Sequence, residues 1–252
     1  MTLRSFELTA ADGKRIRGDR ADGAGRQVLS ITGFLSKRWG NKSKALAQWC
    51  EEQGWGFCCY DVRGFGDSEG EFTDYTLADW MADARTVISM LANPSDPMTI
   101  VGNSLGGWIA WLMAQEHDQV ERLILVAPAF NMMGVRAKTI SSERRHDWRS
   151  AGWMPWDAGP LHRDWPLSWK WVEESEAYWA SSFDRMRRVR TSILHGSGDS
   201  VIAPEGSREF VDCLRRRDPS FPVELDLVAG DHRLSGPEHM EQLHRLLLEA
   251  VA

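Results

Sequence analysis

Short apolar runs alternate with amphipathic stretches along most of this 252-residue chain, and this alternation restricts the fold more than any other feature of the sequence. The runs have no polar face, which is typical of strands buried on both sides of a sheet. The stretches between them carry apolar residues at helical spacing. The sequence therefore predicts an α/β fold, with a mostly parallel central sheet flanked by helices. The expected elements are a hairpin (5–8 and 15–17, around Asp12-Gly13), strands 28–32, 57–60, 98–101, 123–126, 191–194 and 223–228, and helices 42–53, 77–91, 105–116, 205–216 and 237–250.

The alternation is interrupted once, between Phe130 and Arg190, where the sequence has no clear strand. About sixty residues is much longer than an ordinary connection in such a fold. The sequence therefore predicts a core of residues 1–129 and 191–252 and a helical lid inserted at 130–190. The insertion holds seven of the 13 tryptophans: Trp148, Trp153, Trp156, Trp165, Trp169, Trp171 and Trp179.

A serine stands between glycines in the segment Gly102-Asn103-Ser104-Leu105-Gly106. This G-x-S-x-G pattern is typical of a nucleophile elbow, a sharp turn in which small neighbours let the main chain pass closely and the hydroxyl stays accessible. The alternative is a tight turn without a catalytic role. An apolar run precedes the serine and a helical pattern follows it, so the context favours Ser104 as a nucleophile.

A serine nucleophile needs a base, and the base needs a group that orients it. In open parallel sheets, such groups lie just past the carboxyl ends of strands. Asp199 follows the expected strand 191–194 on a glycine-rich turn, and His232 follows the strand that ends at Val228. We therefore expect Ser104, Asp199 and His232 to form a catalytic triad, in the chain order typical of this architecture.

Two other residues compete for these roles. Asp231 is adjacent to His232, but neighbouring residues project in different directions, which favours Asp199 as the acid. His195 also follows a strand, but its position directly before Gly196 favours packing over catalysis. Of the remaining histidines, His117 and His146 follow no expected strand, His239 and His244 fall in the last expected helix, and His162 lies in the insertion without an assigned role.

Five motifs, in order, make the chain resemble the α/β-hydrolase family over nearly its whole length. Thr32-Gly33-Phe34-Leu35 resembles the family's first oxyanion loop, and Asp61-Val62-Arg63-Gly64-Phe65-Gly66-Asp67-Ser68 resembles its D-x-R-G-x-G-x-S loop. Gly102-Asn103-Ser104-Leu105-Gly106-Gly107 resembles its nucleophile elbow. His195-Gly196-Ser197-Gly198-Asp199 resembles its acid turn, and Gly230-Asp231-His232 resembles its histidine loop. Within the family, Ser104-Leu105-Gly106-Gly107-Trp108 and Asp231-His232-Arg233 resemble the mitochondrial palmitoyl-protein thioesterase and acyl-glucuronide esterase branch.

The chain departs from the family pattern at two places. Thr32 stands where the family often has a histidine, and the valine and proline that follow the acid are displaced into Val201-Ile202-Ala203-Pro204. Neither change removes a member of the expected triad.

The resemblance implies a serine carboxylic-ester hydrolase, an esterase that acts on small or medium apolar acyl esters through an acyl-enzyme. The main-chain N–H groups of Phe34 and Leu105 would form the oxyanion hole. No cofactor and no metal are implied. We expect residues 130–190 to select the substrate, because such a segment folds over the carboxyl ends of the strands. Most of its tryptophans are expected to form the insertion's own core.

Composition excludes several other classes. The net charge of -6 argues against nucleic-acid binding, and no run of about 18 apolar residues is present for a membrane span. The chain has neither an H-E-x-x-H motif nor a P-loop. The charged, glycine-rich start and four cysteines without a disulfide pattern favour a cytoplasmic protein with reduced thiols.

Three alternatives stay open from the sequence. An acyl-protein or acyl-CoA type thioesterase forms the same acyl-enzyme and differs only in its leaving group. A non-catalytic ligand-binding homologue keeps the scaffold but usually lacks a triad member. Perhydrolysis or carbon–carbon bond hydrolysis also uses a serine nucleophile. The expected partner is a small-molecule ester or thioester, and the sequence does not indicate an oligomeric state.

Overall fold

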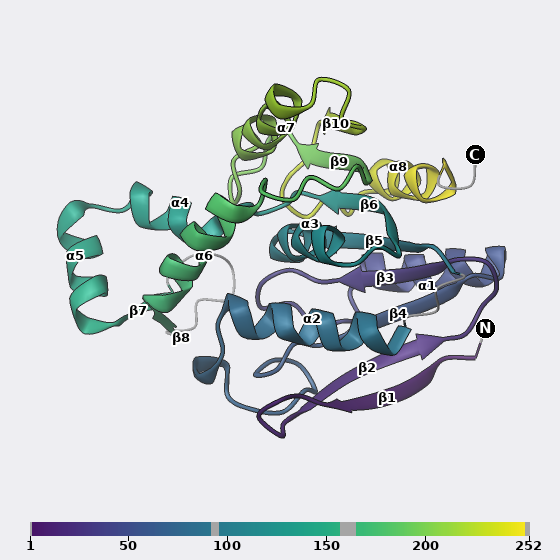
Figure 1. Cartoon of the computed structure of the whole chain (residues 1–252), viewed down its shortest axis with the longest axis horizontal. Helices are drawn as coiled ribbons and strands as arrows, with labels where there is room; N and C mark the ends of the chain where they lie inside the picture. Colours follow the sequence, from purple (N-terminus) through teal and green to yellow (C-terminus); the bar gives the residue numbers. More distant parts are fainter. Residues whose placement is uncertain (1, 92–95, 157–164, 250–252) are drawn as a thin grey trace.

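The computed structural model describes residues 2–91, 96–156 and 165–249, and its centre is an eight-stranded sheet (Figure 1). The strand order is β1-β2-β4-β3-β5-β6-β9-β10. β2 pairs antiparallel with β1 and β4, and the pairs from β4 to β10 are parallel. The predicted α/β fold with a mostly parallel sheet is therefore confirmed. The strands are β1 (Arg4–Thr9), β2 (Arg15–Ala21), β3 (Gln27–Ile31), β4 (Gly56–Tyr60), β5 (Met98–Asn103), β6 (Val120–Val126), β9 (Arg190–Gly196) and β10 (Val223–Val228).

Helices cover both faces of the sheet. The apolar residues of α1 (Asn41–Gln53) and α8 (Pro237–Leu248) share one cluster with Cys59 of β4. Those of α2 (Leu77–Leu91), α3 (Leu105–Glu116) and α7 (Glu205–Arg217) share the larger cluster on the other face, which includes Cys58. Successive strand residues point to opposite faces, so these adjacent cysteines belong to different layers of the core.

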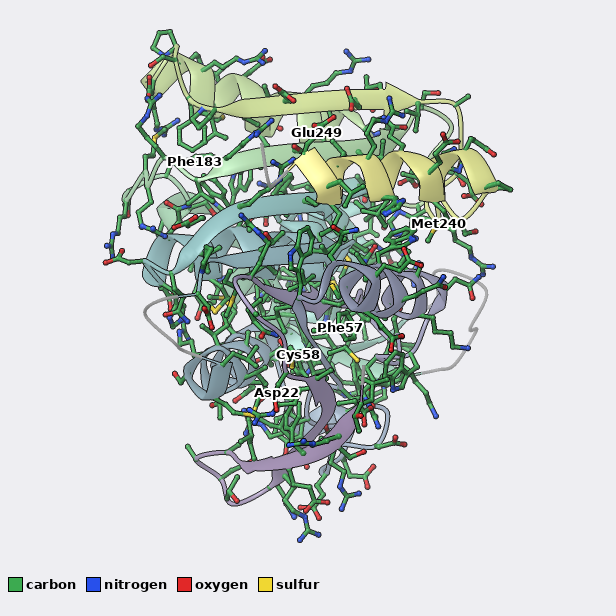
Figure 2. The ribbon with its side chains drawn as sticks, turned by 90° about the vertical axis from the view of Figure 1, so that its right-hand side faces the viewer. Asp22, Phe57, Cys58, Phe183, Met240 and Glu249 are labelled. Atoms are coloured by element: carbon green, nitrogen blue, oxygen red, sulfur yellow. The ribbon has the colours of Figure 1, made fainter. Side chains whose placement is uncertain are left out.

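Side chains lie on both sides of the sheet (Figure 2), in two clusters of buried apolar residues. Figure 2 labels Phe57 and Cys58 of β4 within it, and every residue of β4 is buried. The four cysteines are unpaired, and three of them, Cys50, Cys58 and Cys59, are buried as expected. None of the described helices is both long enough and apolar enough to cross a membrane.

Residues 130–190 connect β6 to β9, and Figure 1 shows their helices beyond the edge where the parallel strands end. The prediction that this segment has no strand was wrong, because β7 and β8 form an antiparallel pair in which Pro155 faces Pro166. Proline argues against a strand because it cannot donate to the ladder, but a two-stranded ribbon has two free edges and tolerates it. The described elements are α4 (Met132–Thr139), α5 (Ser142–Ala151), β7 (Trp153–Trp156), β8 (Trp165–Ser168) and α6 (Lys170–Ser181).

Helix α6 holds this segment against the core. The ring of Trp171 packs edge-on against Trp80 of α2 and Phe34, with centroid separations of 4.9 and 5.4 Å. The Glu174 carboxylate accepts a hydrogen bond of 2.9 Å from the main-chain N–H of Ala78, in the first turn of α2. A carboxylate at a helix N-terminus is stabilised by the unpaired N–H groups there. Helix α6 is therefore docked on the core by both apolar and charged contacts.

The D-x-R-G-x-G-x-S loop is tied to α2 by a buried ion pair. The Arg63 guanidinium lies 2.5 Å from Asp83 Oδ1, and the main-chain N–H of Arg63 donates to Asp83 Oδ2 at 2.8 Å. The Asp83 side chain is fully buried, while the second carboxylate on Arg63, that of Asp12, is partly exposed. This pair fixes the position of the loop relative to α2.

We predict that Asp83→Ala lowers the free energy of unfolding by about 3–5 kcal/mol, because it leaves the buried Arg63 guanidinium without its main partner. Arg85→Ala is the matched control on the same helix. Its ion pair with Glu116 is solvent-exposed on both sides and should contribute no more than about 1 kcal/mol. Urea unfolding followed by tryptophan fluorescence measures both values, and equal small losses would contradict this role for Asp83.

Candidate active site

Ser104 occupies the sharp turn between β5 and α3, with φ 52° and ψ −122°. Positive φ is strained for a residue with a Cβ and costs about 1–3 kcal/mol. The neighbouring glycines allow close passage of the main chain. A Cβ on Gly102 would lie 2.5 Å from the carbonyl oxygen of Gly106, and a Cβ on Gly106 would lie 2.4 Å from that of Ile31. Each of these spacings excludes a larger residue.

Ser104, His232 and Asp199 lie in one continuous line of hydrogen bonds. His232 lies in the loop after β10, and its Nε2 is 3.1 Å from Ser104 Oγ. Its Nδ1 is 2.7 Å from Oδ2 of Asp199, which lies on the turn after β9. The side chain of His232 is 20% exposed, whereas that of Asp199 is fully buried. The structure thus brings the three residues predicted from the sequence to one edge of the sheet.

The buried Asp199 carboxylate is fully hydrogen-bonded. Its Oδ1 accepts from the main-chain N–H groups of Val201 and Ile202 at 2.8 and 2.9 Å. Burial alone would raise the pKa of Asp199, but hydrogen bonds from His195, His232 and the Ile202 N–H outweigh burial and hold the pKa well below its ordinary value. Asp199 is therefore a carboxylate at neutral pH.

The rival acid, Asp231, points back into its own loop. Its Oδ1 accepts from the main-chain N–H groups of Arg233 and Leu234 at 3.0 and 3.2 Å. These bonds form a tight turn directly after the position of His232. The Asp231 carboxylate thus shapes the histidine loop, and Asp199 is the carboxylate that contacts the imidazole.

Of the two residues expected to supply oxyanion N–H groups, Leu105 adjoins Ser104 in the chain, and Phe34 follows a glycine that approaches the serine closely. Leu105 follows it directly as the first residue of α3. Phe34 follows Gly33 in the loop after β3, and a Cβ on Gly33 would lie 3.0 Å from the Ser104 Cβ. The loop therefore passes so close to the serine that a side chain at position 33 would be crowded.

Thr32 replaces a histidine common in the family, and its hydroxyl closes this loop. The Thr32 Oγ1 donates to the Ser36 carbonyl oxygen at 3.1 Å. The Ser36 main-chain N–H donates to the Gly33 carbonyl oxygen at 3.2 Å. The threonine thus supports the turn that carries Gly33 and Phe34 by a hydrogen bond of its own.

A hollow of about 290 Å³ opens at Ser104 and His232 and has a basic lining. Lys37, Lys42 and Arg233 line it, and its described lining includes no carboxylate. The Lys42 ammonium donates to the Arg233 carbonyl oxygen, and burial lowers the pKa of Lys42. The sequence does not predict this group of cations, because Lys37 and Lys42 lie near the start of α1 and Arg233 lies far away in the chain, in the loop after β10.

The tryptophans of residues 130–190 do not line this hollow in the described part of the chain. Trp148 and Trp171 are each only 1% exposed, and the Trp148 indole N–H donates to the Leu167 carbonyl oxygen at 2.8 Å. Trp153 is 55% exposed. The side chains of Trp156 and Trp165 lie outside the described part. Trp148 thus serves the segment's own packing, as expected, whereas Trp171 packs against Trp80 and Phe34 outside the segment.

His195 is buried, as its position before Gly196 suggested, but it also touches the expected acid. Its Nε2 is 3.1 Å from Asp199 Oδ2, and its Nδ1 is 2.8 Å from Ser207 Oγ. The sequence analysis assigned it to packing alone. The spacing of four residues between His195 and Asp199, across a glycine-rich turn, is the feature that brings the two side chains together.

The other described histidines lie away from the triad. His239 hydrogen-bonds the Ala229 carbonyl oxygen at 2.7 Å, and His244 stacks on Trp49 with a centroid separation of 4.4 Å. His162 lies outside the described residues. Among the residues that the structure describes, no group of three or more histidine, cysteine or acidic side chains is arranged to hold a metal ion.

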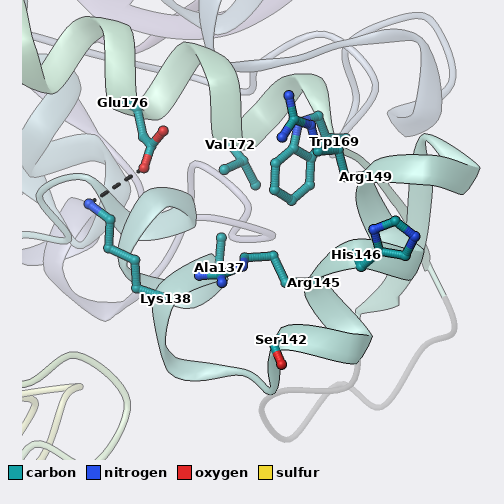
Figure 3. Close-up of a pocket in the computed structure, with 9 residues that line it drawn as sticks. All are labelled: Ala137, Lys138, Ser142, Arg145, His146, Arg149, Trp169, Val172 and Glu176. Atoms are coloured by element: carbon teal, nitrogen blue, oxygen red, sulfur yellow. Dashed lines mark ion pairs between the residues drawn. The ribbon is translucent and has the colours of Figure 1, made fainter.

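A second hollow, of about 440 Å³, lies between α4, α5 and α6 (Figure 3). Lys138, Arg145 and Arg149 line it, and Glu176 forms an ion pair of 3.4 Å with Lys138. None of the triad residues lines this hollow. It is a basic surface of residues 130–190, distinct from the hollow at Ser104.

Comparison with known proteins agrees with this architecture. Residues 28–178 match the model of the family described as serine aminopeptidase, S33. The mitochondrial palmitoyl-protein thioesterase ABHD10 of Mus musculus is 25% identical over 92% of this chain and 75% of its own length. The structure of alpha/beta hydrolase domain-containing protein 10 from mouse superposes with a TM-score of 0.86 at 22% identity and covers 98% of each chain. A putative hydrolase from Agrobacterium vitis S4 superposes with a TM-score of 0.90 at 22% identity and covers 100% of each chain.

The expected resemblance to α/β-hydrolases is confirmed by these matches. The chain is an enzyme, a serine hydrolase. Because the family model matches more than half of its length, the chain belongs to the serine aminopeptidase S33 family of α/β-hydrolases.

Proposed function

We propose that this chain is a serine carboxylic-ester hydrolase that works through Ser104, His232 and Asp199 and an acyl-enzyme. The observation that carries the proposal is the unbroken line of hydrogen bonds from Ser104 Oγ through the His232 imidazole to the buried Asp199 carboxylate, at 3.1 and 2.7 Å. The substrates would be esters of small or medium apolar acyl groups.

In the first half-reaction, Ser104 Oγ attacks the acyl carbonyl carbon while its proton passes to His232 Nε2. Asp199 accepts a hydrogen bond from the Nδ1–H group of His232, which fixes the tautomer of the imidazole and stabilises the imidazolium. His232 then gives the proton to the leaving oxygen, which departs as an alcohol. In the second half-reaction, His232 takes a proton from water as the water attacks the acyl-enzyme, and the proton returns to Ser104 as the acid is released.

The oxyanion of each tetrahedral intermediate would be met by the main-chain N–H groups of Phe34 and Leu105. Leu105 begins α3, so the partial positive charge at the helix N-terminus adds to the field at this point. Main-chain donors make the side chains of the two residues secondary for this role. The strained φ of Ser104 supports the proposal, because residues held in such sparsely populated backbone conformations cluster at functional sites.

The basic hollow supports a polar leaving group. His232 protonates the leaving group, so this part of the substrate lies on the side of His232, where Lys37, Lys42 and Arg233 line the hollow. These cations would accommodate a polar or acidic alcohol better than a long alkyl chain, because burying an unpaired charge against hydrocarbon is costly.

A thioesterase is the second candidate, and the relative called palmitoyl-protein thioesterase favours it. A thioester would give the same acyl group on Ser104 and release a thiol in place of an alcohol. A non-catalytic ligand-binding homologue is less well supported, because the nucleophile, base and acid are all present and within hydrogen-bond distance of one another.

We propose that residues 130–190 act as a lid that selects the acyl group. The supporting contact is that between Trp171 of α6 and Phe34, one of the two expected oxyanion residues, with a centroid separation of 5.4 Å. The Trp171 ring thus links α6 directly to Phe34 of the expected oxyanion hole.

Ser104→Ala should abolish ester hydrolysis, with a loss in kcat on the order of 10⁶-fold, because the variant has no nucleophile. The test is turnover of p-nitrophenyl acetate by the folded variant, checked by circular dichroism. Ser197→Ala, an exposed serine of the acid turn, is the control and should keep its activity. Comparable turnover by the wild type and Ser104→Ala would overturn the assignment.

The value of kcat/KM should rise between about pH 5 and 8, the range in which histidine side chains lose their proton, because only neutral His232 accepts the serine proton. The ionisation of Asp199 should not appear in the pH profile of kcat/KM over this range, because its lowered pKa keeps it charged. Its contribution to stability is lost only as the pH falls below the range in which an unfolded aspartate ionises. A rate independent of pH over this interval would argue against a histidine base.

Trp171→Ala should change the order of preference among p-nitrophenyl esters from C2 to C16, because it opens space beside Phe34. Trp153→Ala, in the same segment but 55% exposed, is the matched control and should keep the wild-type order. Thermal unfolding of both variants separates loss of fold from altered selection. An unchanged order in folded Trp171→Ala would contradict the lid proposal.

A further inference from the structure

We propose that His195 is a positioning residue of the active site, which with Ser207 holds the Asp199 carboxylate in the orientation that His232 requires. The inference rests on the proposed triad and extends it to a second imidazole and a second hydroxyl. His195 contacts neither Ser104 nor the expected oxyanion residues, so it would act through Asp199 alone.

The contacts of His195 are those of a buried hydrogen-bonding group. Its side chain is fully buried at the end of β9. Its Nε2 lies 3.1 Å from Asp199 Oδ2 and 3.1 Å from the Ile202 carbonyl oxygen. Its Nδ1 lies 2.8 Å from Ser207 Oγ, and Ser207 on α7 is itself completely buried. Both ring nitrogens thus have partners inside the protein.

These partners define the tautomer of His195. Two oxygen acceptors face Nε2, so Nε2 must carry a hydrogen, because a lone pair there would face only other lone pairs. A hydroxyl faces Nδ1, and Ser207 is able to donate its proton to that nitrogen. The Nε2–H tautomer therefore satisfies Asp199, Ile202 and Ser207 at once, and the two acceptors at Nε2 select it.

The Asp199 carboxylate is in consequence held at both oxygens. Val201 and Ile202 N–H groups occupy Oδ1, while His195 and His232 share Oδ2. Neither a lysine nor an arginine of the described residues hydrogen-bonds this carboxylate, so the two histidines are the titratable groups in contact with it. The hydrogen bond from His195 fixes the rotation of the carboxylate. It also shares Oδ2 with His232, so it weakens the hydrogen bond by which Asp199 stabilises the imidazolium form of His232.

This role predicts a change in the reaction that packing alone would not produce. Without the His195 donor, Oδ2 is a stronger acceptor for His232, and the imidazolium keeps its proton to a higher pH. The carboxylate also loses one of its restraints, so the fraction of His232 aimed at Ser104 falls. The rise of kcat/KM should move to higher pH, and kcat should fall while KM changes little.

The experiment compares pH profiles of p-nitrophenyl acetate hydrolysis for the wild type and three variants. His195→Met removes the donor at similar volume. It should lower kcat by about 10- to 100-fold, the loss typical when the hydrogen-bond partner that orients a metal ligand is mutated. His195→Gln keeps an N–H donor and should recover most of the activity. His239→Gln is the control, because this buried histidine bonds the Ala229 carbonyl oxygen and should keep the wild-type profile.

If folded His195→Met keeps the kcat and the pH profile of the wild type, the proposal is overturned, because His195 then serves packing alone. If His195→Met does not fold, nitrogen NMR of the wild type labelled at histidine decides the question. A protonated Nε2 and an unprotonated Nδ1 on His195 are expected, and the opposite tautomer would overturn the proposal. Either failure would leave Ser104→Ala inactive, so it is distinguishable from failure of the triad itself.

Discussion

Close contact between main-chain segments at the end of β5 is the constraint on which the site depends. Gly102 and Gly106 leave no room for a side chain where the strand, the first turn of α3 and the end of β3 meet. This packing holds Ser104 at a positive φ that a free chain would avoid. The strain is local, whereas the contacts that maintain it come from β3, β5 and the first turn of α3, so these elements together hold the serine in one position.

The second requirement is a stable negative charge inside the protein. Burying a carboxylate is costly unless its oxygens are hydrogen-bonded. Two N–H groups and two imidazoles meet that need for Asp199, and three of the four come from residues within four positions of it along the chain. The acid turn thus stabilises its own charge, and His232 enters from another loop to complete the site. Three of the four hydrogen bonds to the carboxylate therefore do not depend on His232.

Much of the fold followed from sequence periodicity. The helices at 77–91 and 105–116 and the strand at 223–228 have the predicted bounds, because their apolar repeats are strong. Strand β5 runs on to Asn103, past its apolar run, because ladder pairing with β3 and β6 does not require apolar side chains. The hairpin of β7 and β8 was missed because its prolines are unfavourable in longer sheets.

The candidate site followed from the sequence to the extent that each residue comes directly after a strand. Ser104, Asp199 and His232 could be proposed because parallel strands end at one edge of a sheet. The hydrogen bond from His195 could not, because it depends on the shape of a turn. The cations at the Ser104 hollow could not either, because Lys42 and Arg233 approach each other only in the folded chain.

The most direct test of the central claim is the identity of the residue that carries the acyl group. Brief reaction with p-nitrophenyl acetate, acid quenching and peptide mass spectrometry would locate the adduct. The proposed mechanism predicts one acetyl group, on the Ser104 hydroxyl, that disappears as turnover is completed. Stoichiometric acetylation of any other residue during productive turnover, with Ser104 unmodified, would contradict it.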